Sequence, residues 1–259
     1  MIPHPIPVNF ARMRPLALAA LLTLLFAATA TRSRGQDTPD DLVASHERAA
    51  YGMVRIESSN AAAVTATGWL LEQREGVRPV VITNAHVAEA IPIPLFPEVI
   101  FYQGSAQPPV RLRGRFVYAS DAIDFAVIAL NTDPPSAASG PRALSIETAD
   151  VRRGERIVLG GNPNGWEFQT TEGVVSGIAP SNPACGRARN CIMVDAASMS
   201  GSSGGPALNR RGRVIGMLWG GQTFLHAFGL RIDNPAFSFL IHARVLEDEL
   251  ATIARRGRR

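Results

Sequence analysis

Two adjacent serines in a glycine-rich run are the residues of this sequence with the clearest capacity for covalent chemistry. The run Gly201–Pro206 reads GSSGGP. Glycine permits positive φ angles and close backbone approach, so such a loop can aim amide N–H groups at one point. The amides of Gly201 and Ser203 would stabilise the oxyanion that forms when the Ser203 hydroxyl attacks a carbonyl carbon. The run predicts a nucleophilic serine with an oxyanion hole, and an ordinary glycine-serine turn is the alternative.

A base must activate such a serine, because a hydroxyl is weakly nucleophilic at neutral pH, and a third group must orient that base. Of the five histidines, His86 stands just after the β-rich run Val80–Thr83, where a strand end presents side chains to a cleft. Asp124 begins the apolar run Phe125–Leu130, where its carboxylate can be partly buried against an imidazole. Asp121 competes with it but would lie in the preceding turn. We predict His86 as general base and Asp124 as the residue that orients it.

A rival triad uses the same serine. The run Gly201–Gly205 also satisfies the G-x-S-x-G pattern of a nucleophile elbow, and Asp233 and His242 follow it in the order found in α/β-hydrolases. That fold needs a helix directly after the serine, whereas the following Gly-Gly-Pro would break a helix and a strand-like run, Val214–Trp219, comes next. The surviving chain order is histidine, aspartate, serine, which is the order in chymotrypsin.

Two sets of short β-rich runs, separated by turn residues, must position these side chains. The first set comprises Met53–Ile56, Ala66–Leu71, Val80–Thr83, Val99–Tyr102, Arg111–Tyr118 and Phe125–Leu130. The second set comprises Arg156–Leu159, Phe168–Ile178, Cys191–Asp195, Pro206–Asn209, Val214–Trp219 and Phe237–Ile241. A turn-rich linker, residues 132–141, joins the two sets. Short strands with almost no helix between them favour paired antiparallel barrels or sandwiches, with the cleft where the halves meet.

Helices are expected only outside the two β-rich sets. The segment Thr38–Asp41 reads as an N-cap, a first-turn proline and acids near the positive end of a helix that runs to about Ala50. In Arg244–Arg255, apolar residues recur at helical spacing among acidic ones. We predict a short N-terminal helix and a C-terminal helix.

The first thirty residues have the pattern of a secretory signal peptide. Two arginines precede the apolar run Leu16–Ala30, which ends in small residues. The run is shorter than the roughly 18 residues that a membrane-spanning helix needs. We expect export to a periplasmic or extracellular location without a stable membrane anchor, and the true start is either Met1 or Met13.

The composition excludes several kinds of chemistry. All 26 basic residues are arginine, so phosphate-binding Walker loops, Schiff-base enzymes and serine-lysine hydrolases are excluded. The net charge of +4 comes from the two ends of the chain, so no basic stripe for nucleic acid is expected. His46-Glu47 lacks the second histidine of a zinc peptidase motif, and we predict no metal site.

Cys185 and Cys191 are the two cysteines of the chain. In an oxidising compartment they should form a disulfide that closes a short loop, and two free thiols are the alternative. Two thiols alone cannot make a structural zinc site.

Three ordered motifs resemble those of trypsin-like peptidases of the HtrA/DegP type. They are TNAHV at Thr83–Val87, DFAV at Asp124–Val127 and DAASMSGSSGGP at Asp195–Pro206. Further similar strings lie at Gly161–Pro163, Gly173–Ser176 and Gly212–Gly216, so the resemblance covers about Tyr51 to Val245.

The chain departs from the family pattern in three ways. Ser202 replaces the usual asparagine before the nucleophile, which is conservative because the oxyanion hole uses backbone amides. His242 stands where proline is common. The segment after Ser203 is too short for the PDZ domain of many relatives, so peptide-regulated activation of that kind is not expected.

The resemblance implies an all-β fold of two six-stranded antiparallel barrels, as in chymotrypsin, with the short N-terminal helix and the C-terminal helix added. The expected division is a signal peptide at 1–30, an N-terminal segment at 31–50, a first barrel at 51–131, the linker at 132–141, a second barrel at 142–243, and a helix with a basic tail at 244–259.

The resemblance also implies serine endopeptidase activity on protein or peptide substrates through an acyl-enzyme, without a cofactor. By position in the serine motif, Ala197 would form the base of the primary specificity pocket, and Trp219, Gly220 and Ser238 its walls. An uncharged base would favour small or medium apolar side chains. The alternatives are a catalytically silent relative that binds peptides or proteins and a secreted esterase; the oligomeric state is left open.

Overall fold

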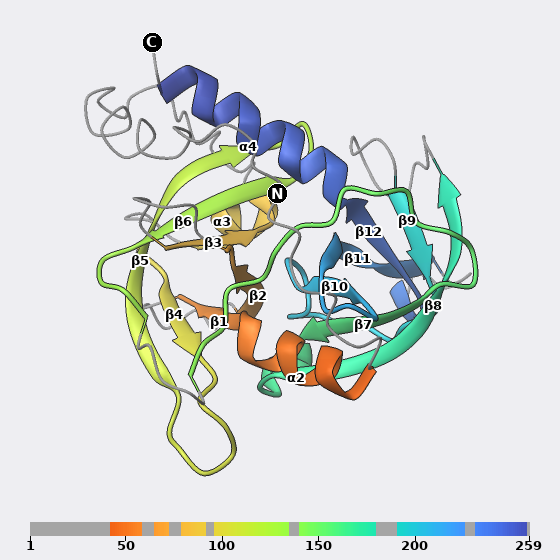
Figure 1. Cartoon of the computed structure of the whole chain (residues 1–259), viewed down its shortest axis with the longest axis horizontal. Helices are drawn as coiled ribbons and strands as arrows, with labels where there is room; N and C mark the ends of the chain where they lie inside the picture. Colours follow the sequence, from red (N-terminus) through yellow and green to blue (C-terminus); the bar gives the residue numbers. More distant parts are fainter. Residues whose placement is uncertain are drawn as a thin grey trace, which may run out of the picture.

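A computed structural model describes residues 42–58, 65–72, 79–91, 96–134, 140–179, 191–225 and 231–257. The described strands form two closed, antiparallel barrels of six strands each (Figure 1). The strand order is β1-β2-β3-β6-β5-β4 in the first barrel and β10-β11-β12-β9-β8-β7 in the second. The predicted double barrel is therefore confirmed.

The first barrel uses strands that the sequence predicts to within two residues. They are β1 Met53–Glu57, β2 Thr65–Leu70, β3 Val80–Thr83, β4 Glu98–Phe101, β5 Val110–Ser120 and β6 Phe125–Leu130. Strand β3 pairs with β6 in a register that sets Val81 opposite Ile128, and both side chains lie in the cluster inside the barrel. Val80 and Ile82 belong instead to a cluster shared with the second barrel. Both faces of β3 are thus covered, which explains a continuously apolar run.

The second barrel contains two strands, β11 and β12, that are at least six residues longer than expected, and β7 is two residues longer. Its strands are β7 Arg156–Gly161, β8 Gln169–Ala179, β9 Cys191–Val194, β10 Pro206–Asn209, β11 Val214–Leu225 and β12 Arg231–His242. The predicted strand in this region, Val214–Trp219, ends just before two glycines. The structure continues the β11–β12 pairing through Gly220 and Gly221 with shifts of register, so these glycines mark irregularities inside a strand rather than its end.

Helix α2, Leu42–Gly52, packs against the second barrel and extends two residues beyond the predicted end. The predicted start of this helix, Thr38–Asp41, lies outside the described residues. Gly52 is required by packing, because a Cβ at this position would lie 2.4 Å from Leu144 Cγ. Leu144 belongs to the segment between the barrels; its amide donates to Leu70 O of the first barrel at 2.8 Å. The connection is therefore bonded to the barrel that it leaves.

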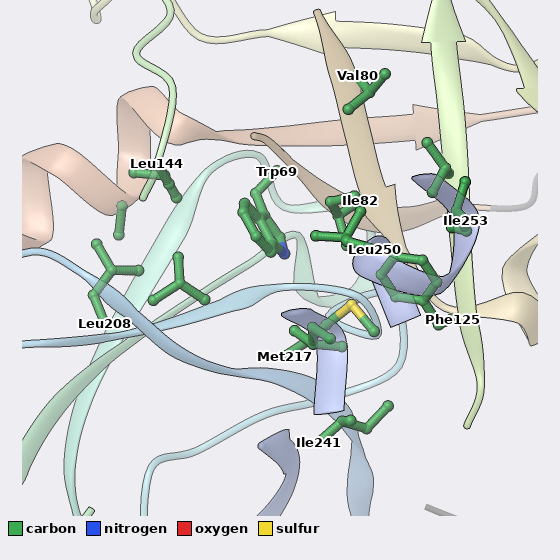
Figure 2. Packing of buried hydrophobic residues seen from close by; sticks show 14 of the residues in the cluster. Trp69, Val80, Ile82, Phe125, Leu144, Leu208, Met217, Ile241, Leu250 and Ile253 are labelled. Carbon is green, nitrogen blue, oxygen red and sulfur yellow. The ribbon is translucent and has the colours of Figure 1, made fainter. Parts of the chain in front are cut away.

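Helix α4, Ala243–Gly257, confirms the predicted C-terminal helix and packs against both barrels (Figure 1). Tyr118 of β5 donates a hydrogen bond to Glu249 of this helix. Burial, together with that bond, raises the pKa of Tyr118 to about 12. Figure 2 shows part of the shared apolar cluster, which includes Trp69, Ile82 and Phe125 of the first barrel, Met217 and Ile241 of the second, and Leu250 and Ile253 of α4.

A third helix, α3 Ala85–Ala90, was not predicted. It begins two residues after β3 ends, and its buried Val87 and Ala88 join the core of the first barrel. Six residues offer too little periodicity for prediction from sequence. Among the helices in the described ranges, none is long and apolar enough to cross a membrane.

Candidate active site

His86 lies in the first turn of α3, where the chain leaves β3. Asn84 is the N-cap residue, with extended backbone angles of φ −81° and ψ 155°, and it is fully buried. Its side-chain Nδ2 donates to Asp124 O at 3.0 Å. The side chain of His86 is 44% exposed. The buried asparagine therefore fixes the turn from which a solvent-accessible imidazole projects.

Asp124 contacts His86 at two points. Its Oδ1 accepts a hydrogen bond from the backbone amide of His86 at 2.9 Å, and its Oδ2 lies 2.8 Å from His86 Nδ1. A carboxylate only accepts, so Nδ1 is the donor and the neutral imidazole carries its free lone pair on Nε2. Asp121, the competing acid, lies exposed in the preceding turn. The structure thus brings Asp124 to the imidazole, in the tautomer that a general base requires.

The backbone of Asp124 is in the left-handed region, with φ 52°. Aspartate is one of the few residues other than glycine that visits this region with any frequency. The conformation sits directly before β6, whose first residue is Phe125, fully buried. The carboxylate, only 15% exposed, is therefore presented from a tight turn at the start of a buried strand.

The Ser203 loop of the second barrel lies against strands β2 and β3 of the first. Thr67 N donates to Ser203 O at 3.0 Å. A Cβ on Gly204, which has φ +84°, would lie 2.2 Å from Thr67 O and 2.4 Å from Thr83 Oγ1. Thr83 ends β3, three residues before His86. Only glycine permits this approach, and it sets the serine loop against the strand that leads to the histidine.

The two amides predicted to form the oxyanion hole flank Ser202. The carbonyl of Ser200 accepts a hydrogen bond from Asn164 N at 2.7 Å. Because the C=O and N–H of a trans peptide point in opposite directions, the N–H of Gly201 points away from Asn164. Within the described part of the chain, the amides of Gly201 and Ser203 donate to no backbone carbonyl. The backbone of the described residues therefore makes no use of these two donors.

The predicted specificity pocket needs one addition, Ser198. Ala197, predicted as its base, is exposed, and its carbonyl accepts from Thr171 Oγ1 at 2.9 Å. The next side chain, Ser198, is buried, and its Oγ lies 2.7 Å from Oγ of the fully buried Ser238. Ser238 in turn donates to Ala196 O at 2.7 Å. Ser198, rather than Ala197, is the side chain turned toward the predicted wall.

The other two predicted wall residues lie on β11. Trp219 and Gly220 are partly exposed, and a Cβ on Gly220 would have nothing within 4 Å. Gly220 pairs with Phe239 and Gly221 with Ser238 across the β11–β12 ladder. The three predicted wall positions therefore lie close together on two paired strands. The position in the serine motif pointed to Ala197 and missed Ser198. Side chains alternate between buried and exposed along an extended chain, and this alternation decides which of the two neighbouring residues is buried.

His242 has a structural task. It precedes α4, and its Nδ1 accepts from Arg244 N at 3.0 Å, which caps the helix. Burial and, second, the charge of Arg244 lower the pKa of His242, while Asp150 acts in the opposite sense. Strand β10, not a helix, follows the Ser203 loop. The α/β-hydrolase arrangement is therefore excluded by the structure.

Several predicted features fall outside the described residues. They include the signal peptide, residues 1–30, and Cys185. Cys191, at the start of β9, is not free, and its pairing with Cys185 stays a prediction. Among the residues that the structure describes, no three His, Cys, Asp or Glu side chains gather in a way that could hold a metal ion.

Comparison with known proteins shows the family of the chain. A family model described as the trypsin-like peptidase domain matches residues 66–217, more than half of the chain. The chain is 27% identical over 183 residues to the serine protease Do-like HtrA of Bacillus subtilis, covering 68% of this chain and 38% of that protein. It is 29% identical over 184 residues to the putative serine protease HhoA of Synechocystis sp., covering 66% and 40%. The chain thus spans about two fifths of the length of these relatives.

Solved structures share the fold. The HtrA-type protease AlgW with tripeptide matches with a TM-score of 0.66 and 18% identity, over 83% of this chain and 64% of that one. The crystal structure of Deg5 matches with a TM-score of 0.60 and 23% identity, over 80% and 90%. At these identities the likeness shows the double barrel alone.

Proposed function

Because the chain belongs to the family of trypsin-like peptidase domains, we propose that it is an exported serine endopeptidase that acts through Ser203, His86 and Asp124. The family match and the named serine protease relatives confirm the predicted resemblance to HtrA-type peptidases, and they support the predicted class, a serine-type endopeptidase. The proposal further includes the roles of Ser203, His86 and Asp124, the oxyanion hole, the protein or peptide substrates and the export. Export is supported by the apolar run Leu16–Ala30 behind two arginines.

The observation that carries the proposal is the two-point contact between Asp124 and His86. Oδ2 holds Nδ1–H while Oδ1 holds the backbone amide of the same residue, so the ring cannot exchange its tautomer without losing a bond. Nε2 is then the basic atom. A largely buried carboxylate that fixes a solvent-accessible imidazole in this way is the arrangement that a serine hydrolase needs for its general base.

The reaction proceeds in two halves. His86 Nε2 takes the proton of Ser203 Oγ as Oγ bonds to the carbonyl carbon of the scissile peptide, and the amides of Gly201 and Ser203 hold the oxyanion. The C–N bond breaks as Nε2 returns the proton to the leaving amine, which leaves an acyl-enzyme. Water then attacks the acyl carbon, gives its proton to Nε2 and releases Ser203 Oγ with that proton.

The pocket proposed here should take small or medium uncharged side chains before the scissile bond. Its buried hydroxyls, Ser198 and Ser238, bond to each other and to Ala196 O, and carry no charge that could pair with arginine or lysine. Digestion of a peptide library checks this preference. Cleavage confined to bonds after arginine or lysine would contradict it.

The experiment that tests the function compares wild type with Ser203→Ala and, as a matched control, Ser202→Ala. We expect a fluorophosphonate probe to label wild type and Ser202→Ala, both of which digest casein, and to leave Ser203→Ala unlabelled. Mass spectrometry of the labelled peptide identifies which of the two adjacent serines reacts. Absence of labelling and of casein digestion in a folded wild type would favour the alternative, a catalytically silent peptide-binding relative; ester turnover without peptide turnover would indicate an esterase.

A further inference from the structure

We propose that Thr67 of the first barrel is a positioning residue that holds the oxyanion loop of the second barrel. This inference rests on the function proposed above. Thr67 belongs to β2 and is fully buried. It does not touch the reacting atoms in the scheme above, and its role would be exerted through the peptide groups on either side of Ser202.

The hydroxyl of Thr67 has its full set of partners. Oγ1 donates to Gly201 O at 2.8 Å and accepts from Asn162 N at 2.9 Å and from Asn162 Nδ2 at 3.0 Å. A hydroxyl has one hydrogen and two lone pairs, so these three bonds use all of its capacity. The side chain therefore links the serine loop to the end of β7 with no capacity left over.

The backbone of the same residue holds the other end of the loop. Thr67 N donates to Ser203 O at 3.0 Å, and Thr67 O accepts from Thr83 Oγ1 at 2.7 Å. The carbonyls of Gly201 and Ser203 are thus fixed by one residue of the opposite barrel. Two fixed carbonyls restrict rotation of the single peptide group between them, Ser202–Ser203, which carries the Ser203 amide.

Asn162 supports this arrangement from behind. It is fully buried; its Nδ2 also donates to Val54 O at 3.2 Å, and its Oδ1 accepts from Phe168 N at 2.8 Å. A Cβ on Gly201 would lie 2.5 Å from Asn162 O. The amide donor Gly201 is therefore backed by a segment that is itself bonded to the first barrel through Thr67 and Val54.

A hydroxyl is needed here because glycine does not hold its own conformation. Gly201 has φ +93°, and glycine populates positive and negative φ with similar ease. The Gly201 carbonyl is fixed by the Thr67 hydroxyl, and a rotation of Gly201 would also redirect its N–H. Valine has the shape of threonine without the hydroxyl, so it would leave Gly201 O and both Asn162 donors buried without Thr67 as their partner.

The test compares Thr67→Val, Thr67→Ser and a control, Ser45→Ala. Ser45 is buried and its Oγ donates to Asn209 O at 3.1 Å, so the control also removes a buried hydroxyl-to-carbonyl bond, on helix α2. Readouts are kcat and KM on a peptide substrate, inhibition by a peptide aldehyde that forms a tetrahedral adduct, and thermal unfolding. We expect Thr67→Val to lower kcat at least about tenfold while KM changes less than about threefold.

Affinity for the aldehyde should fall in Thr67→Val by the same factor as kcat/KM, because both depend on the oxyanion donors. Thr67→Ser should retain the wild-type values within about threefold, and Ser45→Ala should lose thermal stability without loss of kcat. Equal kcat in wild type and Thr67→Val, or a loss that Ser45→Ala reproduces, would overturn the inference while leaving the proposed function intact. An inactive wild type would overturn both. If Thr67→Val does not fold, Thr67→Ala, which leaves room for water, must show the same selective loss of kcat.

Discussion

Replacing Asp124 by asparagine tests the tautomer argument most directly. The change keeps the shape of the side chain but turns one acceptor oxygen into an NH₂ donor. Because the backbone N–H of His86 already occupies Oδ1, the asparagine oxygen must stay there, and the NH₂ group then faces His86 Nδ1. Two donors cannot face each other, so Nδ1 becomes the acceptor and the ring proton moves to Nε2. The atom that should take the proton of Ser203 then already carries one.

The expected loss is large. The corresponding substitution in trypsin lowers kcat by about 10⁴, which equals about 5.4 kcal/mol of transition-state stabilisation. Here the two contacts at 2.8 and 2.9 Å leave the asparagine no second orientation that satisfies both donors of His86. We therefore expect a loss of the same order in Asp124→Asn.

The assay is kcat/KM on a peptide substrate together with the rate of fluorophosphonate labelling, which should fall in parallel because both depend on activation of Ser203. Asp121→Asn is the matched control: the same chemical change, three residues away, at an exposed position in the same turn. It should stay within about twofold of wild type. If Asp124→Asn kept more than about a tenth of wild-type kcat/KM with normal thermal unfolding, the assigned tautomer would be wrong.

Two further substitutions test the scaffold. Gly204→Ala should abolish measurable turnover and labelling, because its Cβ would lie 2.2 Å from Thr67 O. The control Gly154→Ala has a similar φ of +80° but open space around the Cβ, so it should cost only about 1 kcal/mol of folding stability and no activity. A comparable loss of activity in both variants would contradict this packing argument. Burial lowers the pKa of His242 in the folded protein, so the unfolded chain binds a proton at this histidine more readily than the folded chain does. The stability that the neutral His242 cap contributes is therefore complete above about pH 6.5, and it is lost as the pH falls below that value. His242→Asn, which keeps a good cap but does not titrate, should make the unfolding free energy fall less between pH 7.5 and pH 5 than it does in wild type, as measured by urea denaturation. An unchanged difference would show that another group dominates.

The sequence predicts the barrels well where local pattern and burial agree. Strands β3, β6 and β10 begin and end at the predicted residues because their neighbours are strong turn or break signals. The β11–β12 pair was underestimated because Gly220 and Gly221 look like an end of the strand, whereas backbone pairing with β12 carries the ladder past them. Tertiary pairing thus overrides a local signal at this point.

The triad could be proposed from the sequence because the chain has only five histidines and the three candidate residues stand in distinctive settings. Thr67 and Ser198 were missed for the opposite reason. A threonine in a strand and a serine before a loop are ordinary residues, and their roles depend on partners 134 and 40 positions away, respectively. No local sequence pattern reveals contacts between residues so far apart in the chain. The left-handed turn at Asp124 is likewise visible only in coordinates, although aspartate before an apolar strand is compatible with it.

The site depends on both barrels in an unequal way. In the proposed site, the first barrel supplies the imidazole, the carboxylate that contacts it and the buried hydroxyl that bonds to Gly201 O. The second barrel supplies Ser203 on a glycine-rich loop that would be conformationally free on its own. Strand β3 connects these tasks: Val81 is packed inside its barrel, Ile82 is packed in the cluster shared with the second barrel and α4, and Thr83 meets the serine loop. Any shift of one barrel against the other would therefore disturb the shared core and the serine loop together. Because exposing that core to water would cost free energy, the packing opposes such a shift of one barrel against the other.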